Sequence, residues 1–287
     1  MMQATSSLDG PPLEIVARAV GFTVYLDTWA IINLAKHDSL RRERFVAAVR
    51  AGSTDLLFSM ANAVELNGPK GDSLVAVKSF LDELGPHWIP IELSPFEVLD
   101  REQKGVGPSE SCISKGFMDA YFRDRTAGYS PGSGKLINLG PDFFRLGVVL
   151  DWVAANESLP KQLEEFDDLL RTLRALRIRY EQAPFLLDQQ FRTFDPSKPA
   201  TFACGNLSKT LIIESKSHQV KKGDGMDFCH AVMGSAFASF ATLDKNWKRR
   251  VEALPKPNKL ARIYDPSQLD QMVTDIELAL KQRGAPR

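Results

Sequence analysis

The stretch Phe22-Thr23-Val24-Tyr25-Leu26-Asp27 decides the fold of this chain. It is filled with β-branched and aromatic residues and ends in an acid, a pattern that predicts a buried strand. The residues that follow, Thr28 to Lys36, carry large apolar side chains at helical spacing, so we expect a helix directly after the strand. A strand joined at once to a helix is the unit from which parallel sheets are built.

The same alternation runs outward from this stretch into both ends of the chain. Before residue 95 we expect a helix over Arg41 to Val49, a strand over Asp55 to Met60, helices over Ala61 to Leu66 and Leu74 to Leu84, and a strand over His87 to Ile91. After residue 221 we expect a helix over Met226 to Met233, strands over Ala236 to Leu243 and Ala261 to Tyr264, and a helix over Pro266 to Arg283. This order predicts an α/β fold with a mainly parallel sheet.

The middle of the chain lacks the alternation. It favours helices over Asp142 to Ala155, Lys161 to Gln182 and Phe185 to Phe194, while Lys209 to Ile213 fits either a helix or a strand. We therefore divide the chain into an N-terminal tail (1–19), a first core part (20–95), a helical insertion (96–220), and a second core part with a C-terminal helix (221–287).

Charge and composition exclude several classes of protein. The 287 residues include 36 basic and 36 acidic side chains, and 44% are hydrophobic. A neutral, apolar-rich chain is neither disordered nor a protein that binds nucleic acid through bulk charge. It also has no apolar run of about 18 residues, no secretory signal pattern at its start, and three widely spaced cysteines. We expect a reduced, cytoplasmic protein with no membrane partner, whose contact with any nucleic acid is confined to one patch.

Four acids occupy related positions in this predicted fold. Asp27 and Asp244 each follow a strand, Glu65 lies in the helix after the second strand, and Asp227 lies in the first turn of a later helix. The carboxyl ends of the strands and the adjoining helix starts line one crevice of an open α/β sheet. Clustered carboxylates repel one another, and hard cations such as Mg²⁺ or Mn²⁺ relieve that conflict. One or two such ions are typical of phosphodiester hydrolysis.

Around these acids the sequence resembles the PIN-domain family. The similar segments are Val24 to Ala30, Ser59 to Leu66, Asp227 to Ala231 and Ala241 to Asp244. The resemblance implies an α/β/α sandwich around a parallel sheet and a Mg²⁺- or Mn²⁺-dependent nuclease, most often an endoribonuclease. It also implies that the metal-binding and catalytic acids are Asp27, Glu65, Asp227 and Asp244, with Thr242 at the edge of the site. The insertion at 96–220 departs from compact members of the family, and substrate choice is to be sought there.

Polar residues beside the acids complete the predicted site. The bases that follow Asp244 are candidates for gripping the phosphates of single-stranded or structured RNA, or else form a solvated helix face: Lys245, Lys248 and Arg249. Asp224 fits a helix N-cap or a supporting role at the metal. His230 shares a helical face with Asp227, although a packed or surface histidine is the favoured interpretation.

Two other functions stay open. A non-catalytic PIN-like module could hold RNA through the basic patch, or hold a protein partner or a second copy of the chain through the insertion. The segment Gly223 to Asp227 also resembles the acidic motif of haloacid-dehalogenase-like phosphatases, but the residues before it are polar rather than an apolar strand. Gly128 to Lys135 hints at a P-loop with the wrong spacing, and Leu136 stands where Ser or Thr would hold Mg²⁺.

Overall fold

A five-stranded parallel sheet forms the centre of the molecule. The computed structural model describes residues 1–5, 14–19, 21–68, 70–92, 94–126, 141–156, 165–183, 190–214, 221 and 223–284. The strand order is β5-β4-β3-β6-β7, and each neighbouring pair is parallel. The strands are β3 (Phe22–Tyr25), β4 (Thr54–Ser59), β5 (Trp88–Ile91), β6 (Phe240–Thr242) and β7 (Arg262–Tyr264). The predicted α/β class and parallel sheet are confirmed.

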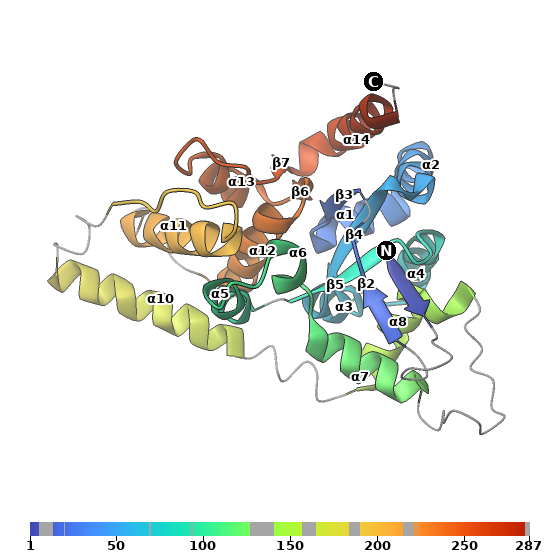
Figure 1. Ribbon diagram of the computed structural model, residues 1–287, viewed down its shortest axis with the longest axis horizontal. Coiled ribbons are helices and arrows are strands. Elements are labelled where there is room, and N and C mark those ends of the chain that lie inside the picture. The colour runs from blue at the N-terminus through green and yellow to red at the C-terminus, as the bar shows by residue number, and fades with distance from the viewer. Residues whose placement is uncertain are drawn as a thin grey trace.

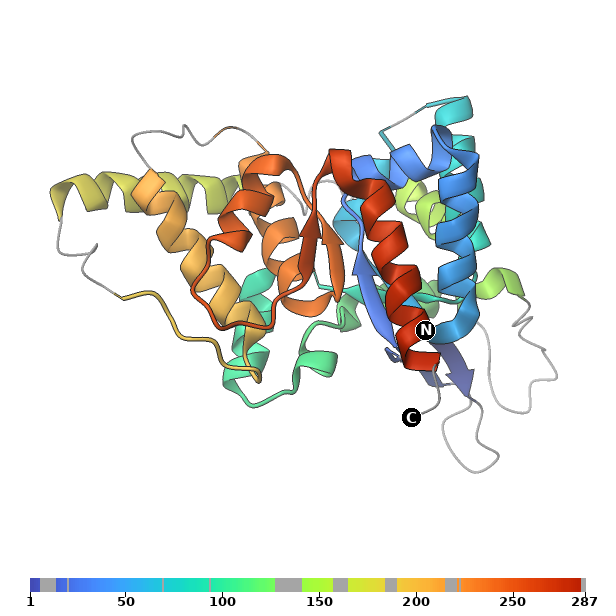
Figure 2. The ribbon, with the colours of Figure 1, turned by 90° about the horizontal axis from the view of Figure 1, so that it is seen from above.

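Helices cover the sheet on both sides. The first half of the chain contributes α1 (Thr28–Lys36), α2 (Ser39–Ala48) with the short π-helix η1 (Val49–Ser53), α3 (Met60–Leu66) and α4 (Asp72–Glu83). The last part contributes α12 (Asp224–Phe237), α13 (Lys245–Glu252), the turn η5 (Pro266–Gln268) and α14 (Leu269–Gly284). In Figures 1 and 2 the strands run between α2, α4 and α14 on one side and α11, α12 and α13 on the other.

The strands are apolar because both faces of the sheet are covered. Every residue of β4 and β5 is buried, and the large side chains of these strands include Phe58 and Trp88. Strands buried on both faces show continuous apolar runs instead of alternation. No helix in the described ranges combines the length and the apolar character that crossing a membrane requires.

Two short strands at the start of the chain were not predicted. Met2–Thr5 (β1) and Glu14–Ala17 (β2) pair in antiparallel fashion, where a tail was expected. The Met2 side chain is only 2% exposed, and its backbone N–H donates to the carbonyl of Pro86 at 2.8 Å. Short strands held by contacts with distant residues give little local signal in a polar sequence.

The inserted region is helical where it is described. Its helices are α5 (Pro95–Gln103), α6 (Pro108–Ser111), α7 (Lys115–Thr126), the turn η2 (Pro141–Phe144), α8 (Leu146–Ala155), α10 (Glu165–Gln182) and α11 (Pro199–Ile213). The ambiguous residues Lys209 to Ile213 end α11. The predicted helix over Phe185 to Phe194 is wrong for residues 190–194, which have no regular structure, and 184–189 lie outside the described residues. The P-loop-like segment and Lys222 lie outside them as well.

One strand begins later in the structure than the sequence predicts. Ala236 and Phe237 end α12, and β6 begins only at Phe240. A short apolar run looks the same in a buried helix and in a buried strand, so the sequence could not place this boundary.

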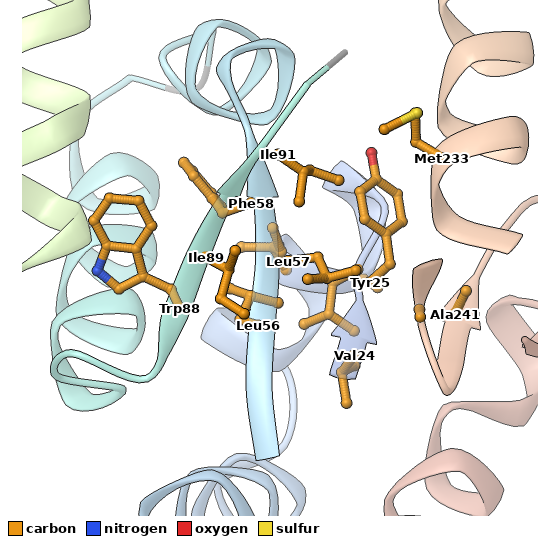
Figure 3. Close-up of a cluster of buried hydrophobic side chains, with 14 of the residues drawn as sticks. Val24, Tyr25, Leu56, Leu57, Phe58, Trp88, Ile89, Ile91, Met233 and Ala241 are labelled. Carbon is orange, nitrogen blue, oxygen red and sulfur yellow. The ribbon is translucent and has the colours of Figure 1, made fainter. Parts of the chain in front are cut away.

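Helix α12 approaches the central strand closely at a glycine. Figure 3 shows Tyr25 reaching from β3 towards α12, with its hydroxyl beside Met233. A Cβ atom at Gly234 would lie 2.7 Å from Cδ1 of Tyr25, a distance that real Cβ atoms do not reach. Gly234 therefore lets α12 sit against β3, and this contact sets the position of the residues at the start of α12.

We expect Gly234→Ala to lower the free energy of unfolding by about 1–3 kcal/mol, because the buried Tyr25 ring has no room to give way. Gly116→Ala on α7 is the matched control, since nothing lies within 4 Å of a Cβ there. The control should be neutral or more stable by up to about 1 kcal/mol. Urea unfolding of both variants measures the difference, and equal stabilities would show that the close approach is unimportant.

Candidate functional site

The site lies at the carboxyl edge of the sheet. Asp27 follows β3 and is the N-cap of α1, where its Oδ1 accepts a hydrogen bond from the Thr28 N–H at 2.6 Å. The N–H of Asp27 donates to Oγ1 of Thr242, at the end of the adjacent strand β6, at 2.8 Å. Thr242 is fully buried, so its hydroxyl ties two strand ends together rather than facing the open edge.

Asp244 repeats this arrangement on β6. It is the N-cap of α13, and its Oδ1 accepts from the N–H groups of Asn246 (2.7 Å) and Trp247 (2.8 Å). Capping thus explains one oxygen of each aspartate. Within the described ranges, Oδ2 of Asp27 and Oδ2 of Asp244 accept no hydrogen bond, so both remain available to a ligand.

Glu65 lies on α3, which begins directly after β4 at the same edge of the sheet. A capping box between Ser59 and Asn62 starts this helix, and Nδ2 of Asn62 also donates to the carbonyl of Leu26 at 3.4 Å. Helix α3 is thereby fixed to the end of β3. The Thr28 hydroxyl donates a hydrogen bond to Oε2 of Glu65.

Asp227 comes from the start of α12. Gly223, with φ of 100°, is the N-cap, and Asp224 is the first helical residue rather than the predicted cap. Oδ2 of Asp224 accepts from the N–H of Lys221 at 2.6 Å. Because α12 leads into β6, its first turn lies at the carboxyl edge of the sheet, and Asp227 faces the other acids there. Asp224 is not the last residue of a strand, as a phosphatase motif would require.

The four acids lie close enough for the charge of one to influence the pKa of another. Burial, together with the charges of Asp27 and Asp244, raises the pKa of Asp227 to about 6. Burial also raises the pKa of Asp27, and the charges of Glu65 and Asp244 raise it further. Each of these acids destabilises the ionised form of another, as expected for carboxylates gathered in one crevice.

A buried histidine lies within the cluster. His230 is 1% exposed, and its Nε2 lies 3.6 Å from Oε2 of Glu65, an ion-pair distance rather than a hydrogen bond. Burial opposes the charged ring, yet Glu65, Asp27 and Asp227 together raise the pKa of His230 above its ordinary value. Burial likewise acts to raise the pKa of Glu65, but His230 and the Thr28 hydroxyl outweigh it and lower that pKa.

Two side chains of this cluster are not indicated as site residues by the sequence pattern. The pattern favours a packed or surface position for His230 and a strand position for Tyr25. In the structure the Tyr25 hydroxyl forms a hydrogen bond with Nδ1 of His230, and both side chains are buried. The available signal was the spacing of Asp227 and His230, three residues apart and therefore on one face of α12.

The donor set has the chemistry of a hard-cation site. Carboxylate oxygens are the ligands that Mg²⁺ and Mn²⁺ prefer. Within the described ranges, the ion-pair contact of these four acids is the one between Glu65 and His230. Across the described residues, however, no group of three or more His, Cys, Asp or Glu side chains is arranged to hold a metal ion by itself. An ion here would bind directly to one or two carboxylates and reach the others through water, as Mg²⁺ commonly does.

The three bases of the predicted basic patch differ in their exposure to solvent. Lys245 is exposed, and Arg249 is 67% exposed with its Nη2 3.7 Å from Oε1 of Glu214. Lys248 is only 15% exposed, donates to the side chain of Gln268, and lies 3.6 Å from Oδ2 of Asp265. Lys245 and Arg249 are therefore the bases of the patch that solvent reaches, whereas Lys248 ties α13 to the turn after β7.

Comparisons with models of protein families, with curated proteins and with solved structures found no match to this chain.

Proposed function

We propose that the protein is a PIN-like, Mg²⁺- or Mn²⁺-dependent ribonuclease that hydrolyses phosphodiester bonds of RNA, most simply as an endoribonuclease. One observation carries the proposal: the electrostatic coupling of Asp27, Glu65, Asp227 and Asp244 at the carboxyl edge of a parallel sheet. Acids that only cap helices do not need to gather where the charges of their neighbours raise the pKa of Asp27 and of Asp227. Such a cost is typical of a functional site.

Each of the four acids would offer a carboxylate oxygen to the cations of the proposed site. Asp27 and Asp244 would offer their Oδ2 atoms to one or two cations, because their Oδ1 atoms cap helices. Asp227 would offer a carboxylate to which no described group donates a hydrogen bond, and Glu65 would offer Oε1. When bound, the cations would polarise a water molecule and offset the charge that develops on the phosphate.

Substrate contacts would come from outside the acidic cluster. Lys245 follows Asp244 directly and is exposed, so it could pair with a phosphate beside the scissile bond. Arg249 lies one turn further along α13. The inserted helices are the proposed place for substrate selection or for binding a partner, since the sheet and its acids need only the remainder of the chain.

A cleavage assay tests the proposal. Purified protein would be incubated with single-stranded RNA, hairpin RNA and the matching single-stranded DNA, each with Mg²⁺, Mn²⁺ or EDTA. We expect cleavage of RNA with either metal and none with EDTA. Cleavage that persists in EDTA would contradict the metal requirement, and cleavage of DNA alone would contradict the choice of substrate. Loss of RNA binding in Lys245→Ala without any cleavage by the parent would favour a non-catalytic module.

Metal binding should also stabilise the fold in a pH-dependent way. A cation neutralises carboxylates that repel one another, and a saturating ligand at about 100 times its Kd adds about 2.7 kcal/mol. Because the pKa of Asp227 is about 6, protons should compete with the cation below that pH. We expect Mn²⁺ to raise the Tm clearly at pH 7.5 and much less at pH 5. An equal rise at both pH values would show that Mn²⁺ binds elsewhere.

A further inference from the structure

Glu65 is held at one oxygen only. The Thr28 hydroxyl donates to Oε2, and Nε2 of His230 lies 3.6 Å from the same atom. No group in the described part of the chain donates a hydrogen bond to Oε1. The Glu65 side chain is 34% exposed, so the carboxylate reaches the open side of the site. Both contacts on Oε2 therefore act to turn Oε1 outwards.

The other ring nitrogen of His230 also has a partner. Its Nδ1 is hydrogen-bonded to the Tyr25 hydroxyl, and Tyr25 lies two residues before Asp27. If the ring is neutral and the hydroxyl donates to Nδ1, the ring proton is on Nε2; if the ring is charged, both nitrogens carry protons and the hydroxyl accepts from Nδ1. In both cases Nε2 is a donor. Nε2 has no hydrogen-bond acceptor among the described residues and is buried. A buried N–H without an acceptor is costly, and Glu65 is the acceptor that faces it.

We propose that His230 is a positioning residue: held by Tyr25, it restrains Glu65 through Oε2 so that Oε1 is presented to the cation. The proposal rests on the proposed metal-dependent function, and it extends that function to two side chains with no direct contact to metal or substrate. Residues that orient a metal-binding carboxylate commonly change metal affinity about 10- to 100-fold when they are removed.

Four variants of the full chain test this role. His230→Leu removes the N–H that faces Glu65, and His230→Gln keeps an amide N–H in its place. Tyr25→Phe removes only the oxygen that fixes the ring. Ser235→Ala is the control, because Ser235 is buried on the same helix but donates only to the carbonyl of Val232. The measurements are the Mn²⁺ Kd by electron paramagnetic resonance, the Tm, and kcat and KM on RNA.

We expect His230→Leu to weaken Mn²⁺ binding about tenfold or more, His230→Gln to restore most of the loss, and Tyr25→Phe to give a smaller loss in the same direction. Ser235→Ala should bind Mn²⁺ as the parent does. RNA cleavage by His230→Leu should recover in part at high Mn²⁺, with KM for RNA unchanged. If His230→Leu does not fold, Tyr25→Phe decides the question through its Mn²⁺ Kd.

The outcomes separate this proposal from the proposed function. A parent protein that binds Mn²⁺ but does not cleave RNA would sink the nuclease proposal while the positioning role could still be supported by the Kd values. Folded His230→Leu or Tyr25→Phe with the Mn²⁺ Kd of the parent would overturn the positioning role alone. A parent that does not bind Mn²⁺ would overturn both.

Discussion

Asp227→Asn is expected to abolish metal-dependent RNA cleavage and at the same time to make the protein more stable. Removing a group that stabilises developing charge lowers rates by a factor on the order of 10² to 10³, and loss of a cation ligand should reach at least the upper value. The gain in stability has a separate origin, because the same carboxylate is costly in the folded protein. Burial and the charges of Asp27 and Asp244 raise its pKa to about 6.

The pH dependence of this gain has a definite sign. An acid whose pKa is higher in the folded protein than in the unfolded chain holds its proton more tightly when folded. The folded state is therefore favoured at low pH, and stability falls as the pH rises from about 4 to about 6. A shift of one pKa unit corresponds to about 1.4 kcal/mol of folding free energy. Because Asp227 is partly exposed, solvent screening reduces the cost of its charge to the folded protein to about 1–2 kcal/mol. Asp227→Asn should recover that amount at pH 7.5 and little at pH 4.

Controls distinguish the site from the fold. Asp27→Asn should lose activity without a fall in Tm, because Asn caps a helix as well as Asp does and because removing this charge relieves the same kind of repulsion that raises the pKa of Asp27. Glu43→Gln alters an exposed carboxylate of α2 that does not belong to the acidic cluster, and it should leave both quantities unchanged. Full activity in both Asp27→Asn and Asp227→Asn would refute the assignment. A Tm that falls in Asp227→Asn would mean that this carboxylate stabilises the fold instead.

Glu102→Ala is expected to cause the largest loss of stability, about 3–5 kcal/mol, because it leaves three donors without their acceptor. Glu102 lies on α5 and is fully buried. Its Oε1 accepts from the N–H of Ala200 at 3.0 Å, and its Oε2 accepts from the N–H and the hydroxyl of Thr201 at 2.8 and 2.7 Å. These groups open α11, so one carboxylate satisfies the donors at the start of that helix and also favours its dipole.

A neighbouring acid on the same helix provides the comparison. Glu97 is 61% exposed, and its Oε2 lies 3.2 Å from Nη2 of Arg101. Exposed pairs of this kind contribute little, so Glu97→Ala should change the free energy of unfolding by less than about 1 kcal/mol. Glu102→Gln should fall between the two, because an amide keeps one acceptor but loses the charge. Urea unfolding measures all three, and a Glu102→Ala value as small as that of Glu97→Ala would contradict the proposed anchoring.

Local patterns in the sequence predict the positions of many of the helices and strands. Helix α1 spans Thr28–Lys36, the range that the apolar spacing indicates, because Asp27 caps it and the apolar face follows at once. The strands β3, β4 and β5 were likewise found within a residue or two. Their signal is local, since continuous apolar runs bounded by polar residues specify a buried strand wherever it packs.

Contacts between distant parts of the chain were not predictable in the same way. Tyr25 and His230 are 205 residues apart, and their hydrogen bond exists only because Gly234 admits the tyrosine ring. Thr242 was expected at the edge of the site, but the pairing of β3 with β6 buries it beneath Asp27. The sequence indicates which acids belong together. It does not indicate which side chains orient them, because this depends on packing.

The order of the strands has a consequence for synthesis of the chain. β3 lies between β4, which follows it closely, and β6, which comes after the whole insertion. A nascent chain that has emerged only as far as α11 contains Asp27 and Glu65 but neither Asp227 nor Asp244. If the protein is the proposed ribonuclease, a chain that is still being translated lacks two of its four acids and should be inactive. Severing the chain within the insertion would give two inactive fragments, and only their reassociation at the β3–β6 seam would restore the site.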